Sequence, residues 1–237
     1  MLRKIMMIIF LILLVISSVE IVKWFKSNQE NEKLQEEISQ AITINETEQV
    51  EEKTYNIDFA KLKEMNSDTV AWVKVEGTDV EYTVVQANNN DYYLNHNFEK
   101  QYNSAGWIFA DYKNKLDGTD KNIIVYGHNR RDGSMFASLK NILKEEWYTN
   151  EENRKVTFVT EDEYSTYEVF SVYQIEREEY YLTTSFANGE FREFIENIKN
   201  RSTVDFNVDV TEADRILTLS TCANDNKYRV VLHAKKI

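Results

Sequence analysis

The chain has 237 residues, a length that suits one domain with additional segments. Its 40 acidic side chains outnumber its 28 basic ones and leave a formal net charge of −12, so the basic surface that nucleic-acid binding requires is absent and no nucleic-acid partner is expected. One cysteine excludes an internal disulfide framework. Together with three histidines it forms no zinc-ligand spacing, so we expect neither a metal site nor a cofactor.

The N-terminus carries one long apolar run. Residues 5–22 are apolar apart from two serines and Glu20, and as a helix they would span about 27 Å of a hydrocarbon core of about 30 Å. A cleaved signal peptide and an uncleaved anchor are the two interpretations. The run is long for a signal peptide, and bulky Ile21 and Val22 stand where small residues would mark a cleavage site. We therefore expect a transmembrane signal-anchor over residues 5–22.

The flanking charges predict an orientation for this anchor. Arg3 and Lys4 would keep residues 1–4 in the cytoplasm and leave the rest of the chain outside the cell. The expected protein is therefore a single-pass protein of the cell membrane with an extracellular domain. Residues 23–54 are polar and acidic and are predicted to form a stem.

The compact domain is predicted to cover residues 55–237 and to begin with a short helix. Phe59, Leu62 and Met65 share one helical face, and Asp58 is a plausible N-cap. Residues 70–86 alternate as a strand does and are interrupted at Gly77.

The rest of the domain alternates between strand-like and helical segments. Strand-like runs cover residues 105–112, 121–128, 155–176, 214–222 and 228–236. Helical spacing is present in residues 135–148 and, with a clear apolar face, in residues 185–202. Seven or eight short strands with few helices predict a mostly β domain, built as a closed or nearly closed barrel with helical decorations.

Cys222 raises the main functional question. A lone cysteine in a strand is most often a small buried hydrophobe, and a free thiol in an exported domain is exposed to oxidation. The alternative is that the thiol is needed for chemistry. It lies at the end of the predicted strand 214–222, before a polar turn, and Arg229 follows seven residues later on the next strand.

His128 has the most suggestive position among the histidines. It ends the apolar strand "NIIVYGH" beside a polar loop, whereas His96 and His233 are more simply interpreted as surface or packing residues. If His128, Cys222 and Arg229 share one cavity, they supply the groups for nucleophilic catalysis. The thiolate can attack a carbonyl, the imidazole can act as acid and base, and the guanidinium can hold the developing oxyanion.

The sequence resembles the sortases, the cysteine transpeptidases of Gram-positive cell surfaces. "TLSTC" followed by Arg229 resembles their signature, and residues 124–148 resemble the segment around their histidine. The stretches "VVQANNNDYYLNHNF" and "GWIFADY" and the helix predicted before the cysteine strand are similar to class B sortases in particular. The resemblance covers roughly residues 55–237.

This resemblance implies a fold and a set of roles. The fold would be a closed eight-stranded sortase-type β-barrel with N-terminal helices and an inserted helix before the cysteine strand. Cys222 would be the nucleophile, His128 the general acid and base, and Arg229 the residue that orients substrate and stabilises the oxyanion. Substrate contacts would fall on six further residues: Asn90, Leu94, Tyr126, Tyr181, Leu182 and Ser220.

The implied reaction is transpeptidation. The enzyme would cleave a C-terminal sorting motif of the Asn-Pro-x-Thr type after its threonine, hold the surface protein as a thioester, and transfer it to an amine of peptidoglycan or of a lipid-linked precursor. Two alternatives stay open at this point. One is a hydrolytic cysteine protease with the same residues, and the other is a non-enzymatic, anchored β-domain that acts as a binding module.

Overall fold

The computed structural model describes residues 2–45, 54–223 and 227–237. The chain divides into two compact units, Met1–Gln40 and Ala41–Ile237, which are described separately. The first unit contains one helix, α1 (Leu2–Ser39), which by length and composition is the only helix among the described residues that could cross a membrane. This helix contains the apolar run 5–22 and is the candidate membrane anchor.

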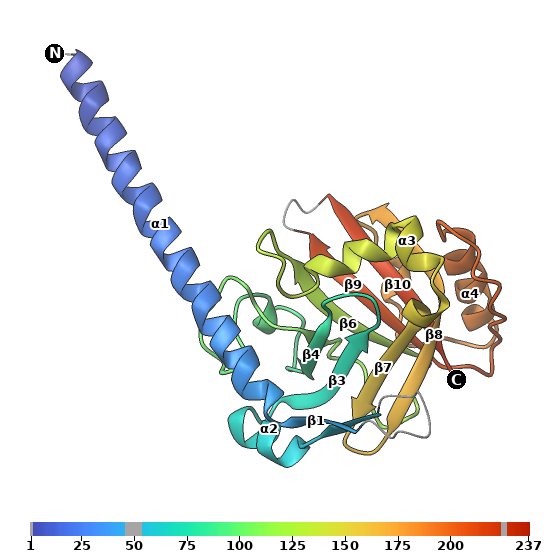
Figure 1. The fold of residues 1–237 in the computed structure, drawn as a ribbon. Helices are drawn as coiled ribbons and strands as arrows, with labels where there is room; N and C mark the ends of the chain where they lie inside the picture. Colours follow the sequence, from blue (N-terminus) through green and yellow to red (C-terminus); the bar gives the residue numbers. More distant parts are fainter. Residues whose placement is uncertain (1, 46–53, 224–226) are drawn as a thin grey trace. The chain divides into compact units, whose positions relative to one another are not determined.

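The second unit is built on a closed barrel of eight strands, in the order β10-β8-β7-β3-β4-β5-β6-β9 (Figure 1). The strands are β3 (Thr69–Val75), β4 (Glu81–Val85), β5 (Phe109–Ala110), β6 (Asn122–Asn129), β7 (Lys155–Thr160), β8 (Tyr164–Glu176), β9 (Ile216–Ala223) and β10 (Tyr228–Lys236). The predicted closed, eight-stranded barrel is thereby confirmed. The strand expected over residues 105–112 is reduced to the two residues of β5.

The short helices and the two remaining strands are not part of the barrel. They are β1 (Ile42–Asn45), β2 (Thr54–Ile57), α2 (Phe59–Met65), η1 (Tyr92–Leu94), η2 (Ala137–Leu143), α3 (Glu145–Tyr148), η3 (Glu151–Arg154), η4 (Tyr180–Leu182) and α4 (Glu190–Asn200). β1 and β2 pair with each other as a separate antiparallel sheet. The predicted cap of α2 is confirmed, since the Asp58 carboxylate accepts the Lys61 N–H at 2.9 Å.

Most neighbouring strands of the barrel are antiparallel, but β6 and β9 are parallel over eight consecutive residue pairs. Parallel strands must be joined by a crossover, and here β7, β8 and α4 lie between them in the chain. Both strands therefore end at the same end of the barrel, so residues 128 and 222 are brought there together.

The helix α4 identifies the outer face of these strands. Its apolar residues Phe191, Phe194, Ile195 and Ile198 form one buried cluster with residues of β8, β9 and β10, among them Ile216 and Val231. Because successive strand residues point to opposite faces, the even-numbered residues of β9 face α4 and the odd-numbered Leu217 and Leu219 face the barrel interior. The predicted amphipathic helix before the cysteine strand is confirmed.

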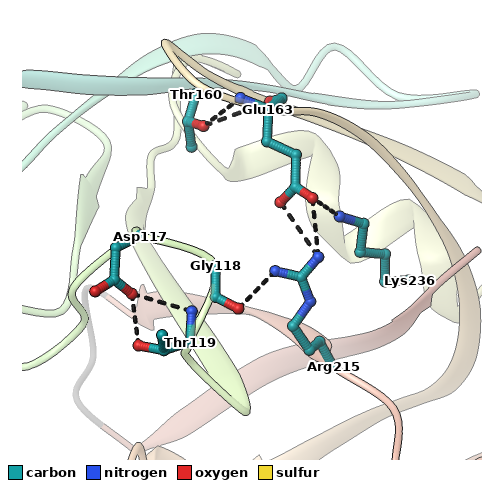
Figure 2. Close-up of polar contacts among 7 residues, drawn as sticks. All are labelled: Asp117, Gly118, Thr119, Thr160, Glu163, Arg215 and Lys236. Carbon is teal, nitrogen blue, oxygen red and sulfur yellow. Dashed lines mark hydrogen bonds and ion pairs between the residues drawn. The ribbon is translucent and has the colours of Figure 1, made fainter.

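The other end of the β6–β9 pair is tied together by a polar clasp around Glu163 (Figure 2). The Glu163 carboxylate accepts hydrogen bonds from Arg215, at 2.9 and 3.3 Å, and from Lys236. Arg215 also donates to the Gly118 carbonyl at 2.8 Å, and Glu163 is fixed in its turn by Thr160. The clasp joins the turn between β7 and β8 to the segments that enter β6 and β9 and to the end of β10.

These partners lower the pKa of Glu163 below its usual value of 4.5, first through the Lys236 hydrogen bond and then through that of Arg215. A carboxyl whose pKa is lowered by folding stabilises the folded state above its unfolded pKa, and this contribution is lost as the pH falls through the folded pKa. We expect Glu163→Gln to cost about 0.5–1 kcal/mol at pH 7, because the partly exposed site is screened by water. Thermal unfolding of the full chain in detergent, followed by circular dichroism, measures this cost.

The difference between wild type and Glu163→Gln should shrink as the pH is lowered below about 4.5. Glu212→Gln, which removes a more exposed pair with Arg192, is the matched control and should change stability less. A Glu163→Gln penalty that is the same at pH 7 and pH 3.5 would contradict the clasp.

Candidate active site

His128 lies one residue before the end of β6, and its neighbours hold the backbone there. The loop after the strand turns back, so that the Phe136 N–H donates to the His128 carbonyl at 2.9 Å. Gly127 allows this close approach: a Cβ at position 127 would lie 2.5 Å from both Ile108 Cδ1 and Phe136 Cγ. Glycine is therefore required by packing at the residue before the histidine.

Among the described residues, the His128 imidazole makes one hydrogen bond. Its Nε2 lies 2.7 Å from the Leu94 carbonyl oxygen, at the end of η1. A carbonyl only accepts, so Nε2 carries a hydrogen. The other ring nitrogen, Nδ1, is buried and has no hydrogen-bond partner among the described residues. In the neutral ring Nδ1 is thus the basic atom.

Cys222 is the register partner of His128 in the parallel β6–β9 pair. Residues paired in this way lie on the same face of the sheet, and position 222 is even-numbered, so this is the outer face defined by α4. The side chain of Cys222 and residues 224–226 of the predicted turn 223–227 lie outside the described residues. Its distance from the imidazole therefore stays a prediction.

Arg229 lies on β10, the strand on the other side of β9 from β6. The β9–β10 ladder ends with the pair Val231 and Ser220, and beyond it the Val230 N–H donates to the Thr221 hydroxyl at 2.8 Å. If the same register continued for two more residues, Arg229 of β10 would lie opposite Cys222 of β9. The half-buried guanidinium donates to the carbonyl of its neighbour Tyr228 at 3.0 Å. Three adjacent strands thus carry the three predicted catalytic residues at one end.

Two of the predicted substrate residues, Asn90 and Tyr126, meet at one carboxylate. Asp111 Oδ2 accepts from Asn90 Nδ2 at 2.9 Å and from the Tyr126 hydroxyl at 2.8 Å. The Tyr112 N–H donates to Asn90 Oδ1 at 3.0 Å, which fixes the orientation of the amide. Asp111 is buried and was not among the residues predicted from the sequence. Its position directly after β5, in "FADY", is the only signal that pointed to it.

The other predicted substrate residues lie around η4 and β9. The Tyr181 hydroxyl and the Ser220 hydroxyl are 3.0 Å apart, and both side chains are buried. This bond joins η4 to the strand of Cys222. Leu182 is half-buried next to Tyr181, and Leu94 is placed by its carbonyl contact with His128.

The remaining two histidines have different surroundings. His96 stacks on Tyr92 with ring centroids 4.1 Å apart, and His233 is fully buried in β10. Burial lowers the pKa of His233 from 6.5 to about 3, so it is neutral at physiological pH. Within residues 2–45, 54–223 and 227–237, no group of three or more His, Cys, Asp or Glu side chains is arranged to hold a metal ion.

Comparison with known proteins identifies the family to which this arrangement is similar. The sortase domain family matches residues 73–237. Sortase B of Listeria monocytogenes is 37% identical over 186 residues, which cover 76% of this chain and 74% of that protein. Sortase B of Staphylococcus aureus is 36% identical over 185 residues, with the same two coverages.

Solved structures show the same similarity in three dimensions. Sortase B from B. anthracis, in complex with AAEK1, has a TM-score of 0.78 and 36% identity, and the match covers 90% of this chain and 99% of that one. Clostridium perfringens sortase B has a TM-score of 0.71 and 40% identity, covering 76% and 99%. A Staphylococcus aureus sortase B–substrate complex has a TM-score of 0.72 and 31% identity, covering 93% and 97%.

The packing around His128 leads to a prediction for Gly127→Ala. The added methyl group overpacks the contact with Ile108 and Phe136, so we expect a loss of about 1–3 kcal/mol in the free energy of unfolding. Denaturant unfolding of the full chain in detergent measures it. Adding Ile108→Val, which removes the Cδ1 atom, should recover part of the loss. Wild-type stability for Gly127→Ala would contradict the close packing.

Proposed function

This chain belongs to the sortase family and is a sortase B-type cysteine transpeptidase of cell wall sorting, and from that premise we propose which residues carry its reaction. Cys222 is the nucleophile, His128 the general acid and base, and Arg229 the group that orients the substrate and stabilises the oxyanion. The observation that carries this assignment is the parallel register of β6 and β9, which pairs His128 with Cys222 at the strand ends. Family membership decides against the non-enzymatic binding module.

The first step is acylation. The Cys222 thiolate attacks the carbonyl carbon of the threonine in a sorting motif of the Asn-Pro-x-Thr type. The carbonyl oxygen gains negative charge, which the permanently charged Arg229 stabilises. As the intermediate collapses, the peptide C–N bond breaks, the leaving amine takes a proton from His128, and the threonine acyl group remains on sulfur as a thioester.

The second step is transfer. An amine of peptidoglycan, or of its lipid-linked precursor, attacks the thioester carbon and gives its proton to His128, and Cys222 leaves as a thiolate. One amide is exchanged for another, so the atoms and the protons balance over the cycle.

The contact between His128 and Leu94 fixes which ring nitrogen of the imidazole carries the hydrogen in the neutral state. Because Nε2 donates to the Leu94 carbonyl, Nδ1 is the nitrogen that donates and accepts the catalytic proton. The segment "VVQANNNDYYLNHNF", which carries Leu94 and Asn90, therefore positions both the general acid and one side of the substrate site.

The candidate anchor α1 places this reaction at the cell surface. We propose that it stays uncleaved and crosses the membrane once, with Arg3 and Lys4 inside and the barrel unit outside. Proteins with a sorting signal and cell wall amines are both reached on that side.

Trapping the acyl-enzyme tests the proposed roles. We expect the full chain in detergent to gain the mass of the acyl fragment when it is incubated with a peptide containing Asn-Pro-Gln-Thr-Gly. Cys222→Ala should show no adduct. Arg229→Lys should acylate about 100-fold more slowly, the usual cost of losing one well-placed oxyanion donor. Intact-mass spectrometry at short reaction times measures all three, with Arg192→Lys, an exposed arginine on α4, as the control.

Product identity separates transpeptidation from simple hydrolysis. With triglycine or diaminopimelic acid present, we expect the threonine to be released as a new amide, and the yield to rise with amine concentration. Release of the free acid alone, with no dependence on either amine, would favour the hydrolytic protease. An adduct that persists in Cys222→Ala would refute the nucleophile assignment.

A further inference from the structure

The buried His233 takes no part in the reaction described above, yet it lies two register positions from Ser220 on the face that carries Cys222. Its partner across the β9–β10 ladder is Thr218. Its ring is surrounded by aromatic residues of β8, η4 and α4, with centroid distances of 5.5–6.4 Å to Tyr173, Phe170, Tyr181 and Phe194. A polar ring placed among aromatic groups requires partners for both of its nitrogens.

One side of His233 is joined to the segment after η4. Asn122 Nδ2 donates to the Thr183 carbonyl at 2.9 Å, which orients the amide so that its Oδ1 accepts from the Thr218 hydroxyl at 2.7 Å. The Thr218 oxygen therefore accepts from His233 Nδ1, 2.8 Å away. This side of the ring must carry a hydrogen.

The other side of His233 is joined to η4 itself. With the hydrogen on Nδ1, the neutral ring accepts at Nε2, and the Tyr173 hydroxyl lies 2.8 Å from that atom. The Tyr180 hydroxyl in turn donates to Tyr173 at 3.0 Å. Burial raises the pKa of Tyr173 well above its usual range, so this hydroxyl keeps its proton and remains a donor.

The hydrogen bonds thus form one directional chain that starts at Tyr180 and ends at the Thr183 carbonyl. Both ends belong to residues 180–183, while the middle of the chain comes from four barrel strands, β6, β8, β9 and β10. Within the same short segment, Tyr181 bonds to Ser220. Arg201 covers the Tyr180 ring, with Cζ 4.1 Å from the ring centroid.

A chain of this kind defines geometry more strictly than apolar packing does. Apolar side chains of similar volume repack at little cost, whereas the donors and acceptors of this chain are paired with one another, and a shift of the segment would leave polar groups unpaired. A hydrogen-bonded segment next to the nucleophile strand is therefore held at a set position relative to Cys222.

We propose that His233 is a positioning residue, which together with Tyr173 and Thr218 holds residues 180–183 as a fixed wall of the sorting-peptide site beside the cysteine strand. This proposal rests on the proposed function. The hydrogen bonds of the chain among the described residues do not include the His128 imidazole, which bonds to Leu94, so we expect the chain to act on peptide binding and not on the chemical steps.

Two tyrosine variants test the proposal with the full chain in detergent and a fluorogenic peptide containing Asn-Pro-Gln-Thr-Gly. Tyr173→Phe and Tyr180→Phe each remove one hydroxyl of the chain. We expect KM for the peptide to rise about 3- to 10-fold, the equivalent of one net hydrogen bond, with kcat changed less than about 2-fold. The double variant should be no worse than the poorer single variant, because both changes break the same chain.

Tyr167→Phe is the matched control. Tyr167 is also a buried tyrosine of β8, but it pairs with Lys236 at the far end of β10. It should leave KM unchanged. Equal effects of all three variants on KM would overturn the proposal, because a general loss of packing would then explain them. A loss confined to kcat would also overturn it, because the effect would then lie in the chemical steps and not in peptide binding.

Hydrogen exchange provides a readout that does not depend on the substrate. By mass spectrometry, we expect amides of residues 180–183 to exchange faster in Tyr173→Phe and Tyr180→Phe than in wild type or Tyr167→Phe. Imidazole 15N resonances should show His233 as the neutral Nδ1–H tautomer at pH 5–7. If the wild type does not cleave the peptide, the proposed function fails, but exchange still decides the positioning role. Unchanged exchange at 180–183, or an Nε2–H tautomer, would refute it.

Discussion

The parallel pairing of β6 with β9 is the constraint on which the site depends. These strands are remote in the chain, yet their register aligns eight residue pairs and carries both strands to the same end of the barrel. Pairing of His128 with Cys222 follows directly from that register. A slip of one residue would send one of the two side chains to the barrel interior, because strand residues alternate between faces. β10 on the other side of β9 then supplies Arg229.

The same register organises a second layer of polar groups below the site. Alternate residues of the three strands face the segment between β8 and α4, and several of them are polar and buried, among them Asn122, Thr218, Ser220 and His233. Burying such groups is costly unless each is hydrogen-bonded, and here the bonds run in one direction through a neutral histidine. These hydrogen bonds offset the cost of burial and, in the proposed positioning role, hold η4 in place. Asp111 likewise holds Asn90 and Tyr126 through hydrogen bonds to its carboxylate.

The two ends of the β6–β9 pair differ in their interactions: ion pairs lie at one end, and the close packing around His128 lies at the other. Where the two strands begin, the Glu163 carboxylate forms ion pairs with Arg215 and Lys236 (Figure 2). These partly exposed charges connect the turn between β7 and β8 to the start of β9 and the end of β10. At the ends where they finish, a glycine without room for a methyl group and a loop that turns back on itself hold His128. Stability and chemistry are thus supported by different residues of the same strands.

Several features could be predicted because they depend on neighbours in the chain. Alternation and helical spacing predicted the strands, the capped helix α2 and the amphipathic α4, and the apolar run predicted a helix that could span a membrane. The motif around Cys222, with Arg229 seven residues later and His128 at the end of an apolar strand, was sufficient to indicate the family and the barrel. Local pattern is informative here because strand and helix periodicity arise from the backbone itself.

Only the tertiary structure decided which of these residues meet. In the sequence, Asp111 is an ordinary acidic residue after a strand, and only the fold brings Asn90 and Tyr126 to it. His233 is likewise an ordinary packing histidine in the sequence, and only the fold places its ring between the hydroxyl groups of Tyr173 and Thr218. The Leu94 carbonyl, which sets the direction of the His128 ring, leaves no trace in side-chain identity. Contacts between distant segments depend on register and on closure of the barrel, and neither is encoded in any single stretch of the chain.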